Sequence, residues 1–322
     1  MEYRVLGKTN LKVSAIGFGS WAIGGNMWGP QDDKDSIAAL HKAIDLGVTF
    51  IDTALGYGNG HSEEIIGQVL KERGKNKEKI YIATKIPPLK WMTTTDDRIN
   101  DIYPKEHIIK SIDKSLKNLK SDCIDLIQLH SWRKHWTDNT DWYETLVKLR
   151  DEGKFKFIGV SVHDNMEDEA LDLIETGRID TIQVVYNVLA QTPQKNLFPK
   201  ALKYNIGIIA RVPLAYGALT GKFTENTTFP KDDFRSGKYI GEGLKNTLEK
   251  IELFKKIVGT NNKEALISAA IRFALAHKAV STTISGIRNL KQAEENCSIF
   301  NQTVSKELID KLSELFIAQK TY

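Results

Sequence analysis

The feature that most constrains this chain is a regular alternation of short apolar segments with segments of helical period. Between the apolar segments, hydrophobic residues recur every three or four positions, as on one face of a helix. Strands that are apolar throughout and separated by helices are typical of a parallel sheet covered on both faces. The predicted strands span residues 13–19, 49–54, 80–85, 124–130, 156–162, 181–187, 207–214 and 281–287.

Eight strand–helix units in 322 residues favour closure into an α/β (β/α)8 barrel, the TIM-barrel fold, over an open doubly wound sheet. An open sheet that binds a dinucleotide would carry G-x-G-x-x-G after its first strand. The nearest match starts at Gly17, lacks the third glycine and does not lead into a helix. Glycines that suit a left-handed residue just beyond a helix follow the periodic segments at Gly47, Gly74, Gly153 and Gly177.

Three segments lie outside the repeat. Residues 1–13 predict an N-terminal β-hairpin that turns at Gly7–Asn10 and plugs the lower mouth of the barrel. The stretches Ile86–Tyr103 and Ala215–Gly241 are long loops on the C-terminal face, and long loops in compact domains are usually functional lids. No linker of Ser, Gly and Pro divides the chain, so we expect a single domain over residues 1–322.

Composition narrows the functional classes. Two cysteines, Cys123 and Cys297, are too few for a disulfide framework, and charges stand where a signal peptide would be apolar, so we expect a cytoplasmic protein. No run approaches 18 apolar residues, which argues against a membrane span. The net charge is +4, and the densest basic run, residues 71–79, contains no aromatic residue. We therefore expect neither nucleic acid nor a membrane surface as a partner; oligomeric state stays open.

Four residues with ionisable side chains lie at or just after the C-terminal ends of neighbouring predicted strands, where barrels have their active sites. Asp52 and Lys85 end the second and third strands, His130 ends the fourth, and Tyr57 lies in the loop after the second. Each alone has an ordinary structural explanation: packing, capping of a loop or a lysine at the rim. We expect the four together to form one site.

This set suits the protonation of a developing alkoxide. A tyrosine is a weak acid unless a neighbouring ammonium stabilises its phenolate, and a carboxylate keeps that ammonium charged despite burial. A histidine can hydrogen-bond the substrate oxygen. Metal chemistry has little support, because His130 and His135 are five residues apart and no HExxH or paired CxxC motif occurs, so we expect no metal. The serine-hydrolase pattern G-x-S-x-G also fails, at His163.

Five motifs in order give the chain a family resemblance. They are YRVLGKTNLKVSAIGFG, GVTFIDTALGYGNGHSEEIIG, Lys85 in IATK, His130 in DLIQLH, and ISGIRNLKQAEEN near the C-terminus. Over nearly its whole length the chain resembles the aldo-keto reductase superfamily, in particular the bacterial branch related to potassium-channel β-subunits. The resemblance implies a (β/α)8 barrel, NAD(P)H as hydride donor, and a tetrad of Asp52, Tyr57, Lys85 and His130 that reduces an aldehyde or ketone.

The resemblance also implies cofactor contacts. Arg288 would meet a 2′-phosphate, for which a guanidinium is well suited, so it favours NADPH over NADH. The alternative is that Arg288 is a solvated arginine before the last barrel helix, without a role in cofactor binding. The implied contacts are Gly19, Ser20, Trp21, Asp52, Ser161, Gln183, Arg211, Val212, Pro213, Leu214, Ala215, Tyr216, Lys222, Arg235, Gly286, Arg288, Gln292, Glu295 and Asn296.

Two positions depart from the family pattern. Val162 replaces an asparagine that commonly helps to bind the carboxamide, and Arg211 replaces an aromatic residue that stacks on the nicotinamide. A guanidinium is planar but always positive, so our hypothesis is that Arg211 disfavours the positively charged oxidised nicotinamide. The alternative is that Arg211 turns towards a loop carboxylate or a cofactor phosphate.

The substrate is not readable from the sequence. Four tryptophans either line the pocket, which would favour apolar or aromatic carbonyls, or pack loops: Trp21, Trp91, Trp132 and Trp136. Two other functions remain as alternatives to carbonyl reduction. One is a lyase in which Lys85 forms a Schiff base, and the other is a nucleotide-binding redox sensor with little turnover, like the channel β-subunits. The presence of His130 favours turnover, since the resemblance to channel subunits includes an amide there.

Overall fold

A computed structural model describes residues 1–25, 27–74 and 79–315. Eight parallel strands form a closed barrel in the order β10-β3-β4-β5-β6-β7-β8-β9. Each lies within or overlaps one of the eight segments predicted as strands, and the barrel prediction is confirmed. The strands are β3 (Ile16–Gly19), β4 (Phe50–Asp52), β5 (Tyr81–Ile86), β6 (Ile124–Leu129), β7 (Phe155–Ser161), β8 (Thr181–Val185), β9 (Gly207–Arg211) and β10 (Val280–Gly286).

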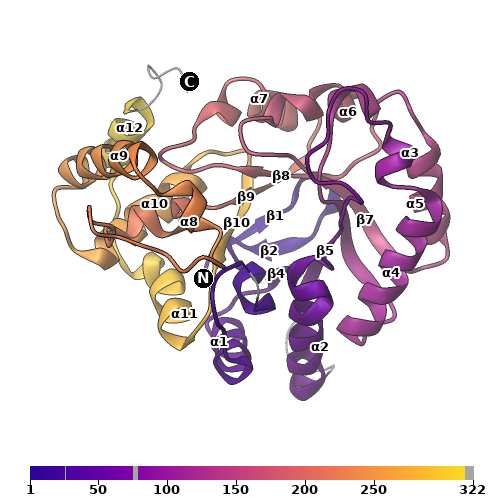
Figure 1. Ribbon diagram of the computed structural model, residues 1–322, viewed down its shortest axis with the longest axis horizontal. Coiled ribbons are helices and arrows are strands. Elements are labelled where there is room, and N and C mark those ends of the chain that lie inside the picture. Colours follow the sequence, from indigo (N-terminus) through magenta and orange to yellow (C-terminus); the bar gives the residue numbers. More distant parts are fainter. Residues whose placement is uncertain (26, 75–78, 316–322) are drawn as a thin grey trace.

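Helices surround the strands as an outer ring (Figure 1). The helices that follow successive barrel strands are α1 (Asp33–Asp45), α2 (His61–Arg73), α4 (Lys105–Leu119), α5 (Asp141–Asp151), α6 (Leu171–Glu175), α7 (Leu197–Lys203), α10 (Lys263–Ala276) and α11 (Leu290–Cys297). The basic run at 71–79 reaches the last turn of α2, while its residues 75–78 lie outside the described part. No helix in the described ranges is both long and apolar enough to cross a membrane.

Helix α4 illustrates how the sequence period produces the ring. Ile108, Ile112 and Leu119 recur on one face and are buried, while the lysines between them face outward. Complete burial of such a side chain contributes about 1.5–3 kcal/mol relative to exposure. The helix ends at Lys120, whose φ of 53° is left-handed. Gly47 and Gly153, which follow α1 and α5, also have positive φ, as predicted.

The N-terminal hairpin closes one end of the barrel, as predicted. Strands β1 (Tyr3–Val5) and β2 (Lys12–Ser14) pair antiparallel. Leu6 and Val13 are completely buried and pack with side chains from the starts of the barrel strands, among them Phe50. The turn presses on β9 so closely that a Cβ at Gly7, whose φ is +50°, would overlap the backbone nitrogen of Gly207.

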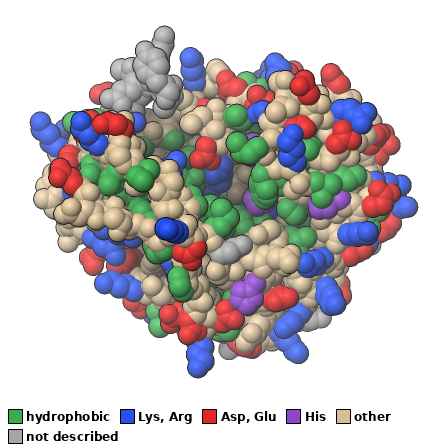
Figure 2. All heavy atoms as spheres, in the orientation of Figure 1, with side chains coloured by type: hydrophobic (Ala, Val, Ile, Leu, Met, Phe, Trp, Pro, Cys, Tyr) green, Lys and Arg blue, Asp and Glu red, His purple; other side chains and the backbone are tan. Residues whose placement is uncertain are grey.

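The two long loops contain short helices. The loop after β5 includes α3 (Ile99–Ile102), and the one after β9 includes the turn Ala215–Thr220 and α8 (Arg235–Lys238). Helix α9 (Glu242–Val258) precedes α10, and α12 (Lys306–Glu314) follows α11. These loops border a hollow near the middle of the face seen in Figure 2, and apolar side chains gather on its rim.

Candidate active site

The barrel brings Asp52, Tyr57 and Lys85 into one hydrogen-bonded group. Asp52 is the last residue of β4 and Lys85 is the penultimate residue of β5. The ammonium of Lys85 donates to Asp52 Oδ1 at 2.6 Å, to the carbonyl of Thr53 at 2.8 Å and to Tyr57 Oη at 3.2 Å. Its three protons therefore have three acceptors. The imidazole of His130 lies 5.6 Å from the ring of Tyr57, centroid to centroid.

The surroundings determine the charge of each group. Burial lowers the pKa of Lys85, but Asp52 and Tyr57 raise it by more, so the net direction is upward and the amine stays an ammonium. Burial raises the pKa of Tyr57 and outweighs the opposing effect of Lys85, so the phenol keeps its proton at neutral pH. Burial, then Lys85 and Arg211, lower the pKa of His130 well below its usual value, which leaves the imidazole neutral.

Asp52 accepts further hydrogen bonds from two barrel glutamines. Its Oδ2 lies 2.7 Å from Gln183 Nε2 and 3.4 Å from Gln128 Nε2. Gln183, assigned to the carboxamide by resemblance, thus donates to the carboxylate of Asp52. A completely buried carboxylate needs such donors, since an unpaired one would cost several kcal/mol.

Tyr57 is held by an unusual turn. Gly58, Asn59 and Gly60 all have positive φ, at 62°, 54° and 101°. A Cβ at Gly58 would overlap the carbonyl oxygen of Gly24, so only glycine permits this approach. The sequence motif around Tyr57 therefore specifies a backbone path as well as an acid.

Behind this turn, the first residues of α2 are hydrogen-bonded to the barrel strands, which the sequence did not reveal. Ser62 contacts the hydroxyls of Thr53 and Ser20 at 3.0 and 2.8 Å. The buried carboxyl of Glu63 accepts from Thr84 at 2.6 Å and from Asn118 at 2.9 Å. The helix that follows Tyr57 is thereby attached to the strands that carry Asp52 and Lys85.

The residues expected at the nicotinamide end lie around the tetrad. Gly19 and Gly286 are register partners at the rim, and Ser161 and Gln183 are register partners in β7 and β8. Trp21 stacks near Tyr57, with ring centroids 6.1 Å apart and planes at 25°. The hydroxyl of the buried Ser20 is engaged with Ser62, so its side chain faces the barrel wall.

Arg211 takes the second of the two orientations considered. Its guanidinium donates to Asp164 Oδ1 at 2.8 Å and to the carbonyl of Val162 at 2.9 Å. Tyr216 Oη donates to the other oxygen of Asp164 at 2.9 Å. Asp164 was not among the predicted residues, although it is the first acidic residue after β7. A loop carboxylate thus joins Arg211 to Tyr216.

The expected pyrophosphate loop has a strained backbone. Val212, Ala215 and Tyr216 have φ of 61°, 47° and 57°, a region that residues other than glycine rarely adopt. Such strain typically persists at ligand-binding positions. Pro213 and Leu214 lie between these residues. Nearby, Arg235 is paired with Asp233 at 2.6 Å and lies over the Trp28 ring at 4.7 Å.

Positive charge accumulates beside this loop. Loss of solvation and then Arg235, Lys263 and Arg288 lower the pKa of Lys222, and burial and then Arg235 lower that of Arg288. Cations that lower one another's pKa form a site that an anion would stabilise. The structure therefore brings together the cations that the resemblance assigns to the cofactor phosphates.

Arg288 is more constrained than expected. It donates to Gln31 Oε1 at 2.7 Å and to the carbonyls of Trp28 and Pro30 at 3.0 and 2.6 Å. Three of its five N–H groups thus hold the loop after β3, which excludes the freely solvated arginine considered above. Among the described residues, no partner takes up its other two N–H groups, which leaves them for a phosphate.

The other residues expected at the adenosine end gather at α11. Gln292 Oε1 accepts from the backbone nitrogen of Arg288 at 2.8 Å. Glu295 forms a two-point ion pair with Lys263 at 2.6 and 2.7 Å, and buried Asn296 donates to the carbonyl of Gly286 at 3.3 Å. The ion pair with Lys263 was not predicted.

The four tryptophans divide into two pairs. Trp132 and Trp136 are 0% and 1% exposed and pack against each other with ring centroids 5.9 Å apart, so they belong to the core. Trp21 and Trp91 lie beside Tyr57 and His130. One pair therefore lies at the candidate site, and the other pair packs in the core.

Comparisons with known proteins agree with this arrangement. The model of the aldo/keto reductase family matches residues 15–317. The chain is 34% identical to aldo-keto reductase YhdN of Bacillus subtilis over 313 residues, 95% of this chain and 91% of that protein. It is 29% identical to a probable voltage-gated potassium channel β-subunit of Arabidopsis thaliana over 324 residues, 92% and 90% of the two chains.

Among solved structures, the chain resembles the glycerol dehydrogenase of Gluconobacter oxydans. The TM-score is 0.79 at 29% identity, and the match covers 99% of this chain and 97% of that one. The family match spans most of the chain, and the barrel, the hairpin and the order of the motifs agree with it. This chain belongs to the aldo/keto reductase family of oxidoreductases.

Proposed function

We propose that this protein is an NADPH-dependent reductase that converts aldehydes or ketones to alcohols. The observation that supports it best is the chain of contacts from Asp52 through Lys85 to Tyr57, which ends in a protonated phenol beside a neutral imidazole. A buried ammonium beside a phenol stabilises the phenolate that proton donation leaves behind.

In this proposal NADPH, when bound, supplies the hydride that adds to the carbonyl carbon. Tyr57 donates its proton from Oη to the carbonyl oxygen as negative charge develops there. His130 hydrogen-bonds the same oxygen and orients it. Lys85 stabilises the resulting tyrosinate, and Asp52 keeps Lys85 charged. The product is an alcohol, and the phenol regains a proton from water.

The chain's own residues fit a phosphorylated dinucleotide. Lys222, Arg235 and Arg288 supply the concentrated positive charge described above, and a doubly charged phosphate would relieve their mutual repulsion. A Cβ added at Gly286 would meet no atom within 4 Å, so the rim of the barrel is open at this position, beside Gly19. We propose Arg288 as the reader of a 2′-phosphate. We also propose that residues 1–322 act as a single domain.

The geometry argues against a lyase that uses Lys85 as a nucleophile. A Schiff base requires a free lone pair on the amine, whereas this amine is an ammonium bound to three acceptors and its pKa is raised. A nucleotide-binding sensor with little turnover would show tight NADPH binding with no carbonyl-dependent oxidation.

The deciding experiment follows NADPH oxidation against a panel of aldehydes, ketones and sugars, with wild type and Tyr57→Phe. Removal of the proton donor should lower turnover by roughly 10²–10⁴-fold while the dissociation constant for NADPH is preserved. Tyr186→Phe is the matched control, since this buried phenol packs against Phe198 and Phe273 and accepts a hydrogen bond from Gln194. Near wild-type turnover in Tyr57→Phe would contradict the assigned acid, and no turnover in wild type would favour the sensor.

A further inference from the structure

The indole of Trp91 forms a wall beside the reaction site. Its ring centroid lies 4.9 Å from the imidazole of His130, with planes at 76°. Its far edge approaches Gly56, the residue before Tyr57, where a Cβ would lie 3.9 Å from Trp91 Cζ2. Trp21 lies near the same site, stacked beside Tyr57. A carbonyl oxygen held by Tyr57 and His130 would therefore bring its substituents close to Trp91, with Trp21 near Tyr57.

The apolar wall continues towards solvent. On the same loop as Trp91, which is 45% exposed, Leu89 is 58% exposed. Met166, on the segment after β7, is 38% exposed and touches Arg133 through its sulfur. Lys90, the cation next to Trp91, is neutralised by Asp97. Exposed apolar side chains beside a hollow are typical of ligand-binding surfaces.

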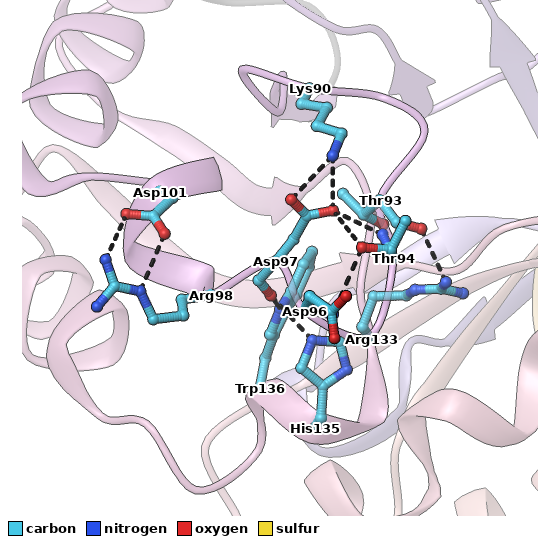
Figure 3. A network of polar contacts seen from close by, with 10 residues as sticks. All are labelled: Lys90, Thr93, Thr94, Asp96, Asp97, Arg98, Asp101, Arg133, His135 and Trp136. Carbon is cyan, nitrogen blue, oxygen red and sulfur yellow. Dashed lines mark hydrogen bonds and ion pairs between the residues drawn. The ribbon is translucent and has the colours of Figure 1, made fainter.

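A single carboxylate closes the loop that carries Trp91 (Figure 3). The oxygens of Asp97 accept from Lys90 Nζ, both at 2.9 Å, and from the nitrogen and hydroxyl of Thr94 at 2.6 and 3.1 Å. Lys90 precedes Trp91 by one residue and Thr94 follows it by three. Asp97 therefore joins the two sides of the loop.

The closed loop is anchored to the segment that follows His130. The backbone carbonyl of Asp97 accepts from His135 Nε2 at 2.9 Å and from Trp136 Nε1 at 2.7 Å. Arg133 donates to the carbonyl of Thr93 at 2.8 Å. Trp136 belongs to the buried core, so this anchor is rigid. Trp91 and His130 are thus held in a constant relation by their own segments.

From this geometry we infer that Trp91 determines substrate specificity and that Asp97 is the residue that positions it. The inference rests on the proposed carbonyl reduction. The preferred substrates are aldehydes or ketones with an aryl or extended apolar substituent, because a preformed indole wall rewards flat apolar groups and offers no partner to several hydroxyls. Small polar carbonyls depend on Tyr57 and His130 alone.

The hydrogen bonds by which Asp97 closes the loop do not depend on pH in the physiological range. Hydrogen bonds from Thr94 and Lys90 hold the pKa of Asp97 down to about 2, against the weaker opposing effect of burial. The carboxylate is therefore ionised at neutral pH. The wall exists before substrate arrives, and it selects substrates without first having to fold around them.

The first test compares Trp91→Ala with Met92→Ala, its neighbour on the same loop, which has no ring contact with His130. Benzaldehyde and hexanal represent apolar substrates, and methylglyoxal and glyceraldehyde represent small polar ones. Trp91→Ala should lower kcat/KM for the apolar pair by about tenfold or more and leave the polar pair within about twofold. Met92→Ala should change neither strongly. Equal losses for both pairs, or for both variants, would overturn the inference.

The second test compares Asp97→Asn with Asp96→Asn, which removes the same charge from the adjacent residue. Asp97→Asn should raise KM for the apolar pair with little change in kcat for methylglyoxal. Amide hydrogen exchange across 89–97 should also accelerate in this variant and not in the control. Identical behaviour of the two variants would show that Asp97 does not position Trp91.

A binding measurement separates this inference from the proposed reaction. Benzamide is an aryl carbonyl that is not reduced, and its affinity can be measured by calorimetry in wild type and Trp91→Ala. An affinity loss of about tenfold supports the wall even if wild type oxidises no NADPH with any carbonyl, which would refute only the reaction. Unchanged affinity beside normal carbonyl reduction would refute only the wall.

Discussion

At the scale of single residues, neighbours decide what each ionisable group can do. Lys85 is completely buried, yet Asp52 keeps it charged, and its three protons are used within the site. Burial, and then the nearby charges of Lys85 and Arg211, hold the pKa of His130 well below its usual value, so its imidazole is neutral. His41, by contrast, lies beside Glu72 near the surface, without comparable burial. Chemistry at this site therefore depends on burial combined with specific partners.

These charge states predict the pH dependence of reduction. Tyr57 stays protonated until the pH exceeds its usual pKa of 10.0, because burial raises that value. His130 does not take up a proton near 6.5, because its pKa lies well below. The pH profile of kcat/KM should be flat between about pH 6 and 9 and should fall above pH 10. A break near pH 6.5 that disappears in His130→Gln would contradict the neutral imidazole.

The position of Arg288 predicts a preference for NADPH over NADH, and its contact with Gln31 provides a control. Arg288→Ala should weaken NADPH binding about ten- to a hundredfold, the equivalent of roughly 1.5–3 kcal/mol for a charge-assisted hydrogen bond, and NADH binding far less. Gln31→Ala removes one bond between Arg288 and the loop after β3 but keeps the charge. Titrations of both cofactors should show little discrimination lost in Gln31→Ala. Equal losses for NADPH and NADH in Arg288→Ala would refute the assignment.

At the scale of elements, the segments after the strands are connected to one another across the mouth. Asp164 after β7 joins Arg211 at the end of β9 to Tyr216 in the next turn. Asp97 after β5 joins the segment after β6 in the same way. Connections between loops let a rigid barrel hold irregular backbone in one conformation.

The ion pair after β7 modifies our hypothesis for Arg211. The carboxylate of Asp164 offsets the charge of Arg211, so the expected preference for NADPH over NADP⁺ is smaller than a lone guanidinium would produce. The measured quantity is the dissociation constant of NADP⁺ divided by that of NADPH. Asp164→Asn should increase this ratio by roughly tenfold, about 1.4 kcal/mol, and Arg211→Tyr should reduce it. Fluorescence titration of both cofactors measures the ratio. The hypothesis fails if it is the same in all three proteins.

At the scale of the whole molecule, the hairpin closes one end of the barrel and the candidate site lies at the other. The hairpin fills the end where the strands begin, while the tetrad and the long loops lie where they finish. Stability and chemistry are therefore located at opposite ends, as is typical of this architecture.

This separation predicts a variant that loses stability without losing activity. Leu6→Ala removes a completely buried side chain from the plug and should lower the free energy of unfolding by about 2–5 kcal/mol. Val5→Ala, at a neighbouring position that is 55% exposed, should cost little. Urea denaturation gives the free energies, and kcat/KM below the transition should match wild type. A large loss of activity in folded Leu6→Ala would show that the two ends are coupled.

The sequence by itself determined the barrel and the place of the tetrad. Apolar periodicity is a local property, and a chain of eight such units has few ways to bury them. Because parallel strands align their carboxyl ends, Asp52, Lys85 and His130 had to share a mouth once the strands were recognised. The glycines around Tyr57 belong to the same local information, since their backbone path depends on a missing Cβ.

Only the tertiary structure decided the partners that come from distant loops. Asp164 lies 47 residues from Arg211, and no period or motif indicates that they meet. The tryptophans show the same limit: identical side chains, Trp91 and Trp136, became a wall and a core residue according to which segments pack against them. Long-range pairing depends on how loops settle on a finished barrel, and that information is spread over the whole chain.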